Sequence, residues 1–216
     1  MSTDGLLTRA DVVYPESDGQ PIAENTLQFE WISTLKWGYD GLFRDDPNVF
    51  VAGDLLWYPV EGDNVTRIAP DVLVAFGRPK GHRGSYQQWR EGGTSPQVVF
   101  EILSPGNRAA EMIKKFRFYE RFGVEEYYIY DPDRREMNGW IREGATLGEV
   151  PEVDGFTSPR LGTRFELGGG DLKVLDPQGR RFLTVMELGL EREAERSRAE
   201  RLAARLRGLG VDPESA

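Results

Sequence analysis

Apolar residues alternate with polar ones, or run together, in four stretches that predict strands. These are residues 49–60, 68–77, 97–103 and 125–132, which are rich in valine, leucine, phenylalanine and tyrosine and end at turn residues. Within the first of them, Gly53 allows a bulge. Apolar residues recur at helical spacing over 21–38 and 108–122, which predicts two helices. The second helix is a crossover long enough to join the third and fourth strands in parallel. The order of elements therefore predicts an α/β fold, αβββαβ, around a mixed central sheet.

The remaining sequence divides into a β-rich extension and a charged helix. Residues 134–185 contain short apolar runs between glycine and proline turns, and we expect them to form strands that pack on the core. From residue 186 the charge alternates in a helical composition. We predict one domain over residues 1–185, with its core at about 21–132, followed by a charged helix and tail at 186–216. That helix is either solvated or pairs with a partner.

The composition of the 216-residue chain excludes several kinds of site. There is no cysteine, which excludes a thiolate metal site and a cysteine nucleophile. His82 is the one histidine, which excludes a histidine-rich zinc site. No apolar run is long enough to span a membrane, and the start MSTDGLLTRADVVYP does not resemble a signal peptide. We therefore expect a cytoplasmic protein that does not enter a membrane.

The net charge of -9 argues against a general polyanion-binding protein, but the charge is unevenly distributed. The segment RPKGHRGSYQQWR, residues 78–90, contains no acidic residue. If the substrate is DNA, its four cations, Arg78, Lys80, Arg83 and Arg90, are the expected phosphate contacts. A solvated surface loop is the alternative interpretation.

Two acidic residues lie in strands that should be buried. Glu101 lies in the middle of QVVFEIL, a run that is apolar on both faces and is typical of a central strand. Asp71 follows Pro70 and begins the run VLVAF. Because the second and third strands are consecutive, we expect them to be adjacent, so that the two carboxylates converge. An unpaired carboxylate in such a place would be strongly destabilising.

The two predicted helices also direct charge inward. In projection at about 100° per residue, Lys115 lies on the core side with Phe116 and Tyr119, whereas Lys114 points the opposite way. The same projection of the first helix puts Glu24 in line with Leu27, Trp31 and Leu35, which form its predicted inward face.

Several acids and one lysine around a single sheet fit a site for a divalent cation such as Mg²⁺, or Mn²⁺ as a substitute. Each residue also has a simpler explanation. Glu101 and Lys115 could form a buried ion pair, Asp71 could cap a turn, and Glu24 could be an acid favoured by the helix dipole.

The element order and the acids resemble the PD-(D/E)XK nuclease fold. Four stretches are similar to a bacterial family called Uma-two, whose members are described as restriction endonucleases: YPESDGQPIAENTLQFEWI, APDVLVAFGRPKG, VVFEILSPGNR and KFRFYERFGVEEYYIYDP. The resemblance covers residues 12–135 and continues less specifically through the C-terminal extension. In this resemblance Asp71 matches the aspartate of the PD motif, Glu101 the acid of (D/E)XK, and Glu24 the acid of the first helix.

The match departs from the motif at its third position, where Leu103 replaces lysine. The Uma-two family resembles this chain in that respect and takes its lysine from the following helix, which here is Lys115. The resemblance also implies that the backbone carbonyl of Ile102 completes a metal site with Asp71 and Glu101, and that Glu24 is a further candidate ligand. It implies Mg²⁺-dependent hydrolysis of phosphodiester bonds, with Glu24, Asp71, Glu101 and Lys115 as catalytic residues. In that interpretation Asp71 and Glu101 hold the Mg²⁺ and Lys115 assists the attacking water.

Three hypotheses follow from the sequence. The first is a metal-dependent DNA endonuclease, which we expect to work as a homodimer if it cuts both strands. The second is a module on a nuclease scaffold that binds nucleic acid or has a regulatory role and whose catalytic activity is latent or absent. The third is an interaction protein whose C-terminal helix pairs with a partner.

Overall fold

The computed structural model describes residues 12–208, apart from residues 18, 20 and 169. Contacts divide the chain into two compact units, Met1–Phe182 and Leu183–Ala216, and each is described by itself. The predicted boundary between residues 185 and 186 stays a prediction. Within the described residues, no helix combines the length and the apolar character needed to cross a membrane.

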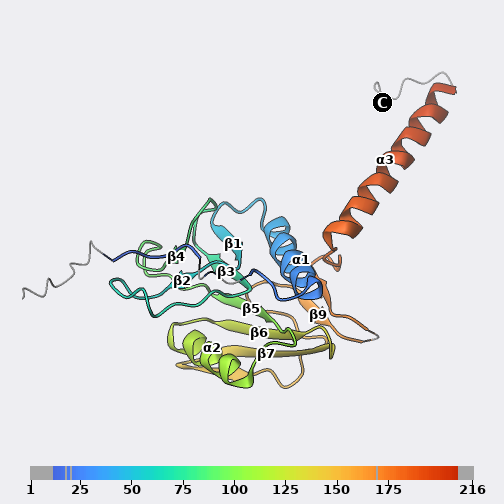
Figure 1. Ribbon diagram of the computed structural model, residues 1–216. Helices are drawn as coiled ribbons and strands as arrows, with labels where there is room; N and C mark the ends of the chain where they lie inside the picture. Colours follow the sequence, from blue (N-terminus) through green and yellow to red (C-terminus); the bar gives the residue numbers. More distant parts are fainter. Residues whose placement is uncertain (1–11, 18, 20, 169, 209–216) are drawn as a thin grey trace, which may run out of the picture. The chain divides into compact units, whose positions relative to one another are not determined.

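Six strands form the main sheet, in the order β1-β3-β5-β6-β7-β8 (Figure 1). Their bounds are β1 Val49–Gly53, β3 Val72–Phe76, β5 Val98–Ile102, β6 Glu126–Asp131, β7 Glu136–Glu143 and β8 Thr146–Glu149. β3 pairs antiparallel with both β1 and β5. β5 and β6 pair in parallel and are connected along the chain by the helix α2, Ala109–Arg121. The predicted mixed α/β fold with an αβββαβ core is confirmed.

The first helix begins later than the pattern predicts. Helix α1 spans Thr26–Leu42, because the Asn25 side chain caps it by accepting a hydrogen bond of 2.8 Å from the backbone N–H of Gln28. Glu24 therefore lies before the helix, and the predicted range 21–38 was wrong at both ends. The inward face is also rotated: Gln28, Ile32, Leu35 and Tyr39 are buried, whereas Leu27 is 39% exposed.

The predicted strand at 49–60 is wrong as a single element. β1 ends at Gly53, and Asp54 has φ 48°, in the left-handed region that turns the chain out of the sheet. The next residues form β2, Trp57–Tyr58, which pairs in parallel with β4, Tyr86–Gln87, in a separate sheet. A hydrophobic pattern that continues across a turn does not reveal the turn, which is why the sequence merged the two strands.

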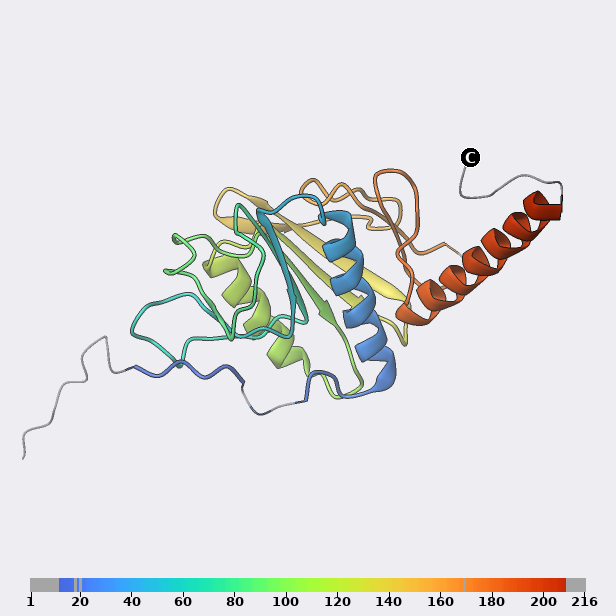
Figure 2. The ribbon, with the colours of Figure 1, turned by 90° about the horizontal axis from the view of Figure 1, so that it is seen from above.

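Alternate residues of the central strands build two cores. Val72 and Phe100 face α1, whereas Leu73 and Val99 face α2 with Tyr119. Figure 2 shows the two helices on opposite faces of the sheet. This arrangement follows from the period of two along each strand and from strands that are apolar on both faces.

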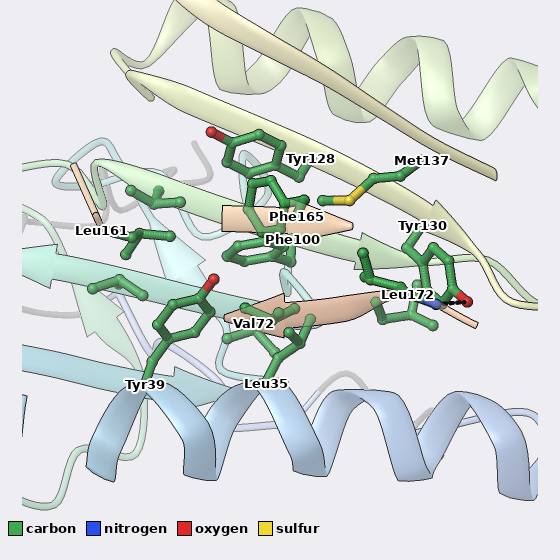
Figure 3. Packing of buried hydrophobic residues seen from close by; sticks show 14 of the residues in the cluster. Leu35, Tyr39, Val72, Phe100, Tyr128, Tyr130, Met137, Leu161, Phe165 and Leu172 are labelled. Atoms are coloured by element: carbon green, nitrogen blue, oxygen red, sulfur yellow. Dashed lines mark hydrogen bonds between the residues drawn. The ribbon is translucent and has the colours of Figure 1, made fainter. Parts of the chain in front are cut away.

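The predicted β-rich extension is present and contributes in two ways. β7 and β8 lengthen the main sheet, whereas β9, Arg164–Glu166, and β10, Lys173–Leu175, form a hairpin-like pair of antiparallel strands. Figure 3 shows Phe165 and Leu172 of this region packed with Phe100 and Tyr130 in the core on the α1 side. The Tyr130 hydroxyl accepts a hydrogen bond of 3.2 Å from the Leu172 backbone N–H.

The second unit contains the predicted terminal helix, α3, Val185–Gly208. A capping box starts it: Thr184 and Glu187 exchange hydrogen bonds of 2.9 Å and 3.2 Å between their side chains and backbone N–H groups. None of its described residues is buried. Whether the helix is solvated or pairs with a partner stays a prediction.

Candidate functional site

The strand register brings Asp71 and Glu101 to neighbouring positions. β3 and β5 pair antiparallel with Val72 opposite Phe100, so Asp71 continues the ladder beside Glu101 on the face toward α2. One carboxylate oxygen of Asp71, Oδ2, accepts a hydrogen bond of 2.6 Å from the backbone N–H of Ile102. Both acids are buried, with 8% of Asp71 and 3% of Glu101 exposed. The structure therefore places two carboxyl groups together where β3 begins and β5 ends, in the middle of the sheet.

Helix α2 supplies two partners to Glu101. Lys115 Nζ donates a hydrogen bond of 2.7 Å to Glu101 Oε2, and the Tyr119 hydroxyl donates one to Oε1. Lys114 is exposed, as its predicted direction requires. The helical period identified Lys115 before the fold was known. Tyr119 was assigned only to the apolar stripe, although its hydroxyl, four residues after Lys115, was a signal that it could reach the same carboxylate.

Burial is the largest influence on the ionisation of Asp71 in this cluster. Burial raises the pKa of Asp71 to about 8, helped by the charge of Glu101 and opposed by Lys115 and the Ile102 N–H. Burial alone would lower the pKa of Lys115, but the carboxylates of Glu101 and Asp71 outweigh it and raise that pKa. Lys115 is therefore a cation at neutral pH and acts as a hydrogen-bond donor.

Glu24 reaches the site from the segment before α1. Its carboxylate accepts a hydrogen bond from the Ser104 hydroxyl, in the turn that follows β5. It also lies directly against Gly106, so that a side chain at that position would meet the Glu24 carboxylate. The predicted acid thus belongs to the site's edge, although the helix that was expected to carry it starts two residues later.

Replacing Gly106 by alanine is expected to displace Glu24 while leaving the fold intact. The added methyl group meets the end of a flexible side chain rather than backbone, so we expect a loss of less than about 1 kcal/mol in unfolding free energy. Thermal unfolding and the activity of Gly106→Ala, in the assay given under Proposed function, would measure both effects when compared with Gly41→Ala at an open helical position. Unchanged activity would show that the position of Glu24 does not matter to the chemistry.

Glu24, Asp71 and Lys115 line a cavity of about 490 Å³, whereas Glu101 is not among its lining residues. Its polar lining includes Glu24, Gln28, Asp54, Arg67, Asp71 and Lys115. The sequence did not single out three of them: Gln28, Asp54 and Arg67. Gln28 is buried and its Nε2 donates a hydrogen bond of 2.9 Å to the Ile102 carbonyl. Because a carbonyl oxygen has two lone pairs, the Ile102 oxygen can still accept a second partner.

Asp54 adds a further acid to this cavity. Its charge contributes to the raised pKa of Asp71, and its backbone N–H donates a hydrogen bond of 3.1 Å to the Asp71 carbonyl. Asp54 has a left-handed φ, which is uncommon at residues other than glycine. Where such residues do occur, they are often at functional sites. A signal in the sequence was available, since an aspartate directly after a strand glycine is typical of such a turn.

Three of the four cations of the predicted basic loop make side-chain contacts within the protein, and none of the four is among the residues that line the cavity. Arg83 forms a salt bridge of 2.6 Å with Glu91, and Arg78 Nη1 donates a hydrogen bond of 2.6 Å to the Glu91 carbonyl. Lys80 Nζ donates a hydrogen bond of 3.1 Å to the Val49 carbonyl, and Arg90 is exposed. A role for these four residues in phosphate binding stays a prediction.

A family model described as "Putative restriction endonuclease", Uma2, matches residues 14–168. The chain belongs to the Uma2 family. A solved structure from Anabaena variabilis, titled a "putative nuclease belonging to DUF820", is 14% identical and matches with a TM-score of 0.49 over 71% of this chain and 88% of that one. That likeness is too low to carry an argument. No curated protein matches the sequence significantly.

Membership of the Uma2 family indicates a nuclease that acts on nucleic acid, and families related to restriction endonucleases generally use divalent metal ions. Among the described residues, no group of three histidine, cysteine, aspartate or glutamate side chains is placed to hold a metal. The donor set nevertheless fits Mg²⁺, which binds oxygen, keeps several of its waters and needs only one or two carboxylates. Asp71 and Glu101 are such a pair. Burial, and after it the charge of Glu101, raises the pKa of Asp71, and a bound cation would favour the ionised form of this carboxyl group.

Proposed function

We propose that this Uma2 protein is a Mg²⁺-dependent endonuclease that hydrolyses phosphodiester bonds of DNA, with Mn²⁺ as a substitute metal. The observation that carries the proposal is the convergence of Asp71, Glu101 and Lys115 at one buried cluster that opens to a cavity of about 490 Å³. Such a cluster is unfavourable for stability alone, because two buried carboxyl groups share one lysine.

Each residue has a proposed role. Asp71 and Glu101, with the second lone pair of the Ile102 carbonyl, would hold the metal ion, and Glu24 would contribute from the cavity edge. When bound, the ion supplies Lewis acidity and lowers the pKa of water. The hydrogen bond from Tyr119 and the salt bridge from Lys115 hold the Glu101 carboxylate in one orientation. The Ile102 N–H does the same for Asp71.

Hydrolysis joins a water oxygen to phosphorus and breaks one P–O ester bond, and the leaving oxygen takes up a proton. Negative charge grows on the non-bridging oxygens during this step. Lys115 lines the cavity as a protonated donor and is suited to stabilise that charge. Its raised pKa makes it unsuited to act as a general base.

Replacing Asp71 by asparagine tests the proposal. Asparagine can still accept the hydrogen bond from Ile102 N–H, but it removes a charge that would bind the metal, so we expect cleavage to fall at least about 100-fold. The assay uses supercoiled and single-stranded DNA with Mg²⁺, Mn²⁺ or EDTA. Asp45→Asn is the matched control, because the Asp45 side chain is 89% exposed. Cleavage by Asp71→Asn at the wild-type rate, or in EDTA, would contradict the proposal.

A latent nucleic-acid-binding module on the same scaffold is the second candidate. The loop contacts that occupy Arg78, Lys80 and Arg83, together with the net charge of -9, weaken the nonspecific affinity for DNA that an active endonuclease uses, and so favour a regulatory role over turnover. Binding of DNA without cleavage under every metal would select this alternative. A homodimer and a cytoplasmic location stay predictions from the sequence.

A further inference from the structure

Arg67 is held at the cavity wall by neutral oxygen atoms. Its Nη1 donates hydrogen bonds to the Asn64 carbonyl, at 3.2 Å, and to the Tyr58 hydroxyl oxygen, at 3.5 Å. Tyr58 is fully buried, and its hydroxyl donates a hydrogen bond of 2.7 Å to the Pro15 carbonyl. The Tyr58 hydroxyl therefore donates its proton to the Pro15 carbonyl and accepts from Arg67 through a lone pair. These contacts fix the Nη1 end of the Arg67 guanidinium.

The other edge of the same guanidinium makes no hydrogen bond to the residues that the structure describes. In the described part of the chain, Nε and Nη2 of Arg67 donate to no atom, and no carboxylate forms a salt bridge with it. Other arginines differ: Arg83 is paired with Glu91 and Arg180 with Asp176, each through its Nε edge. An arginine that is anchored at Nη1 and open at Nε and Nη2 presents two parallel donors to a ligand.

The chemistry of the cavity selects an anion with paired oxygens for that edge. Lys115, the other cation of the described lining, already donates to Glu101 and lacks a pair of parallel donors. Glu24, Asp54 and Glu111 give the remaining lining a negative charge that would repel an anion without a local cation. A guanidinium edge matches two oxygens of a phosphate, and a phosphodiester is the anion that the proposed function brings into this cavity.

We propose that Arg67 is the residue that binds the DNA backbone phosphate at the cavity and thereby places the scissile bond over Asp71 and Lys115. This inference rests on the proposed function. It assigns substrate binding to the cavity wall instead of, or in addition to, the loop at residues 78–90. Because a phosphate contact carries no base information, the effect should be the same for different DNA sequences.

The test is DNA binding by Arg67→Gln, measured by fluorescence anisotropy with labelled single- and double-stranded DNA in Ca²⁺ and in EDTA. Glutamine keeps an amide donor for the Asn64 carbonyl but loses the charge and the paired edge. We expect roughly tenfold weaker binding and a salt dependence whose logarithmic slope is smaller by about one. Arg67→Lys should recover part of the affinity, because it restores charge without the paired donors.

Arg44→Gln is the matched control, since the Arg44 side chain is 78% exposed and pairs only with the neighbouring Asp45 among described residues. Thermal unfolding of each variant shows whether it is folded. If Arg67→Gln is unfolded, the binding test is made with Arg67→Lys instead. Equal affinity and salt slope for wild type and both Arg67 variants would overturn the inference, as would a wild-type chain that binds neither form of DNA. Failure of the proposed function would appear differently, as DNA binding that depends on Arg67 without any cleavage.

Discussion

Glu101→Gln is expected to destabilise the protein by about 2–4 kcal/mol and to remove its nuclease activity. The substitution leaves Lys115, whose side chain is only 15% exposed, as a buried cation without its carboxylate. Breaking one partner of a buried ion pair is strongly destabilising because the remaining charge is poorly solvated. Urea unfolding of the purified variant measures the loss in stability, and cleavage of supercoiled DNA with Mn²⁺ measures the loss in activity.

A second substitution separates the structural effect from the chemical one. In the double variant Glu101→Gln with Lys115→Met the unpaired cation is gone, so we expect stability to return toward that of the wild type while activity stays absent. Glu125→Gln is a suitable control, because Glu125 pairs with Arg160 at the surface and such pairs contribute less than about 1 kcal/mol. A double variant that cleaves DNA would show that Glu101 and Lys115 only support the fold.

The metal-free protein is expected to lose stability as the pH rises from about 4 to about 8. An aspartate in the unfolded chain ionises near 3.8, whereas Asp71 in the folded protein keeps its proton until about pH 8. Between these values the folded state binds more protons, so unfolding free energy falls with rising pH, by at most about 1.4 kcal/mol per pH unit for one group. Unfolding in EDTA between pH 5 and pH 8.5 measures the slope.

Asp71→Asn should flatten that dependence and be more stable than the wild type at pH 8, because it removes the buried charge and keeps an acceptor for the Ile102 N–H. Mn²⁺ should stabilise the wild type more at pH 8 than at pH 6, since the metal competes with the proton for Asp71. It should leave Asp71→Asn unaffected. Asp45→Asn should follow the wild-type curve. A variant at Asp71 that is less stable than the wild type at pH 8 would contradict the assignment.

The local pattern of the sequence determined the core of this protein. Strands that are apolar on both faces, with a long helical crossover, were enough to predict the αβββαβ order and the parallel pairing of β5 with β6. The helical period was enough to direct Lys115, and not Lys114, toward the sheet. These features depend on two short repeats, 2.0 and 3.6 residues, that any stretch of chain carries within itself.

Only the tertiary structure decided which polar groups surround the carboxylates. The cap at Asn25 set the start of α1 and brought Gln28 to the Ile102 carbonyl. The turn at Asp54 and the buried Tyr58 placed Asp54 and Arg67 in the cavity. Arg83 packs over the Phe50 ring, 3.8 Å from its centre, so this cation of the predicted basic loop also contributes to the packing of the fold. The contacts of Gln28 with Ile102 and of Arg83 with Phe50 join segments that are distant along the chain, and no periodic pattern within one segment encodes them. The cap at Asn25 and the turn at Asp54 are local, but they depend on single residues and not on a period.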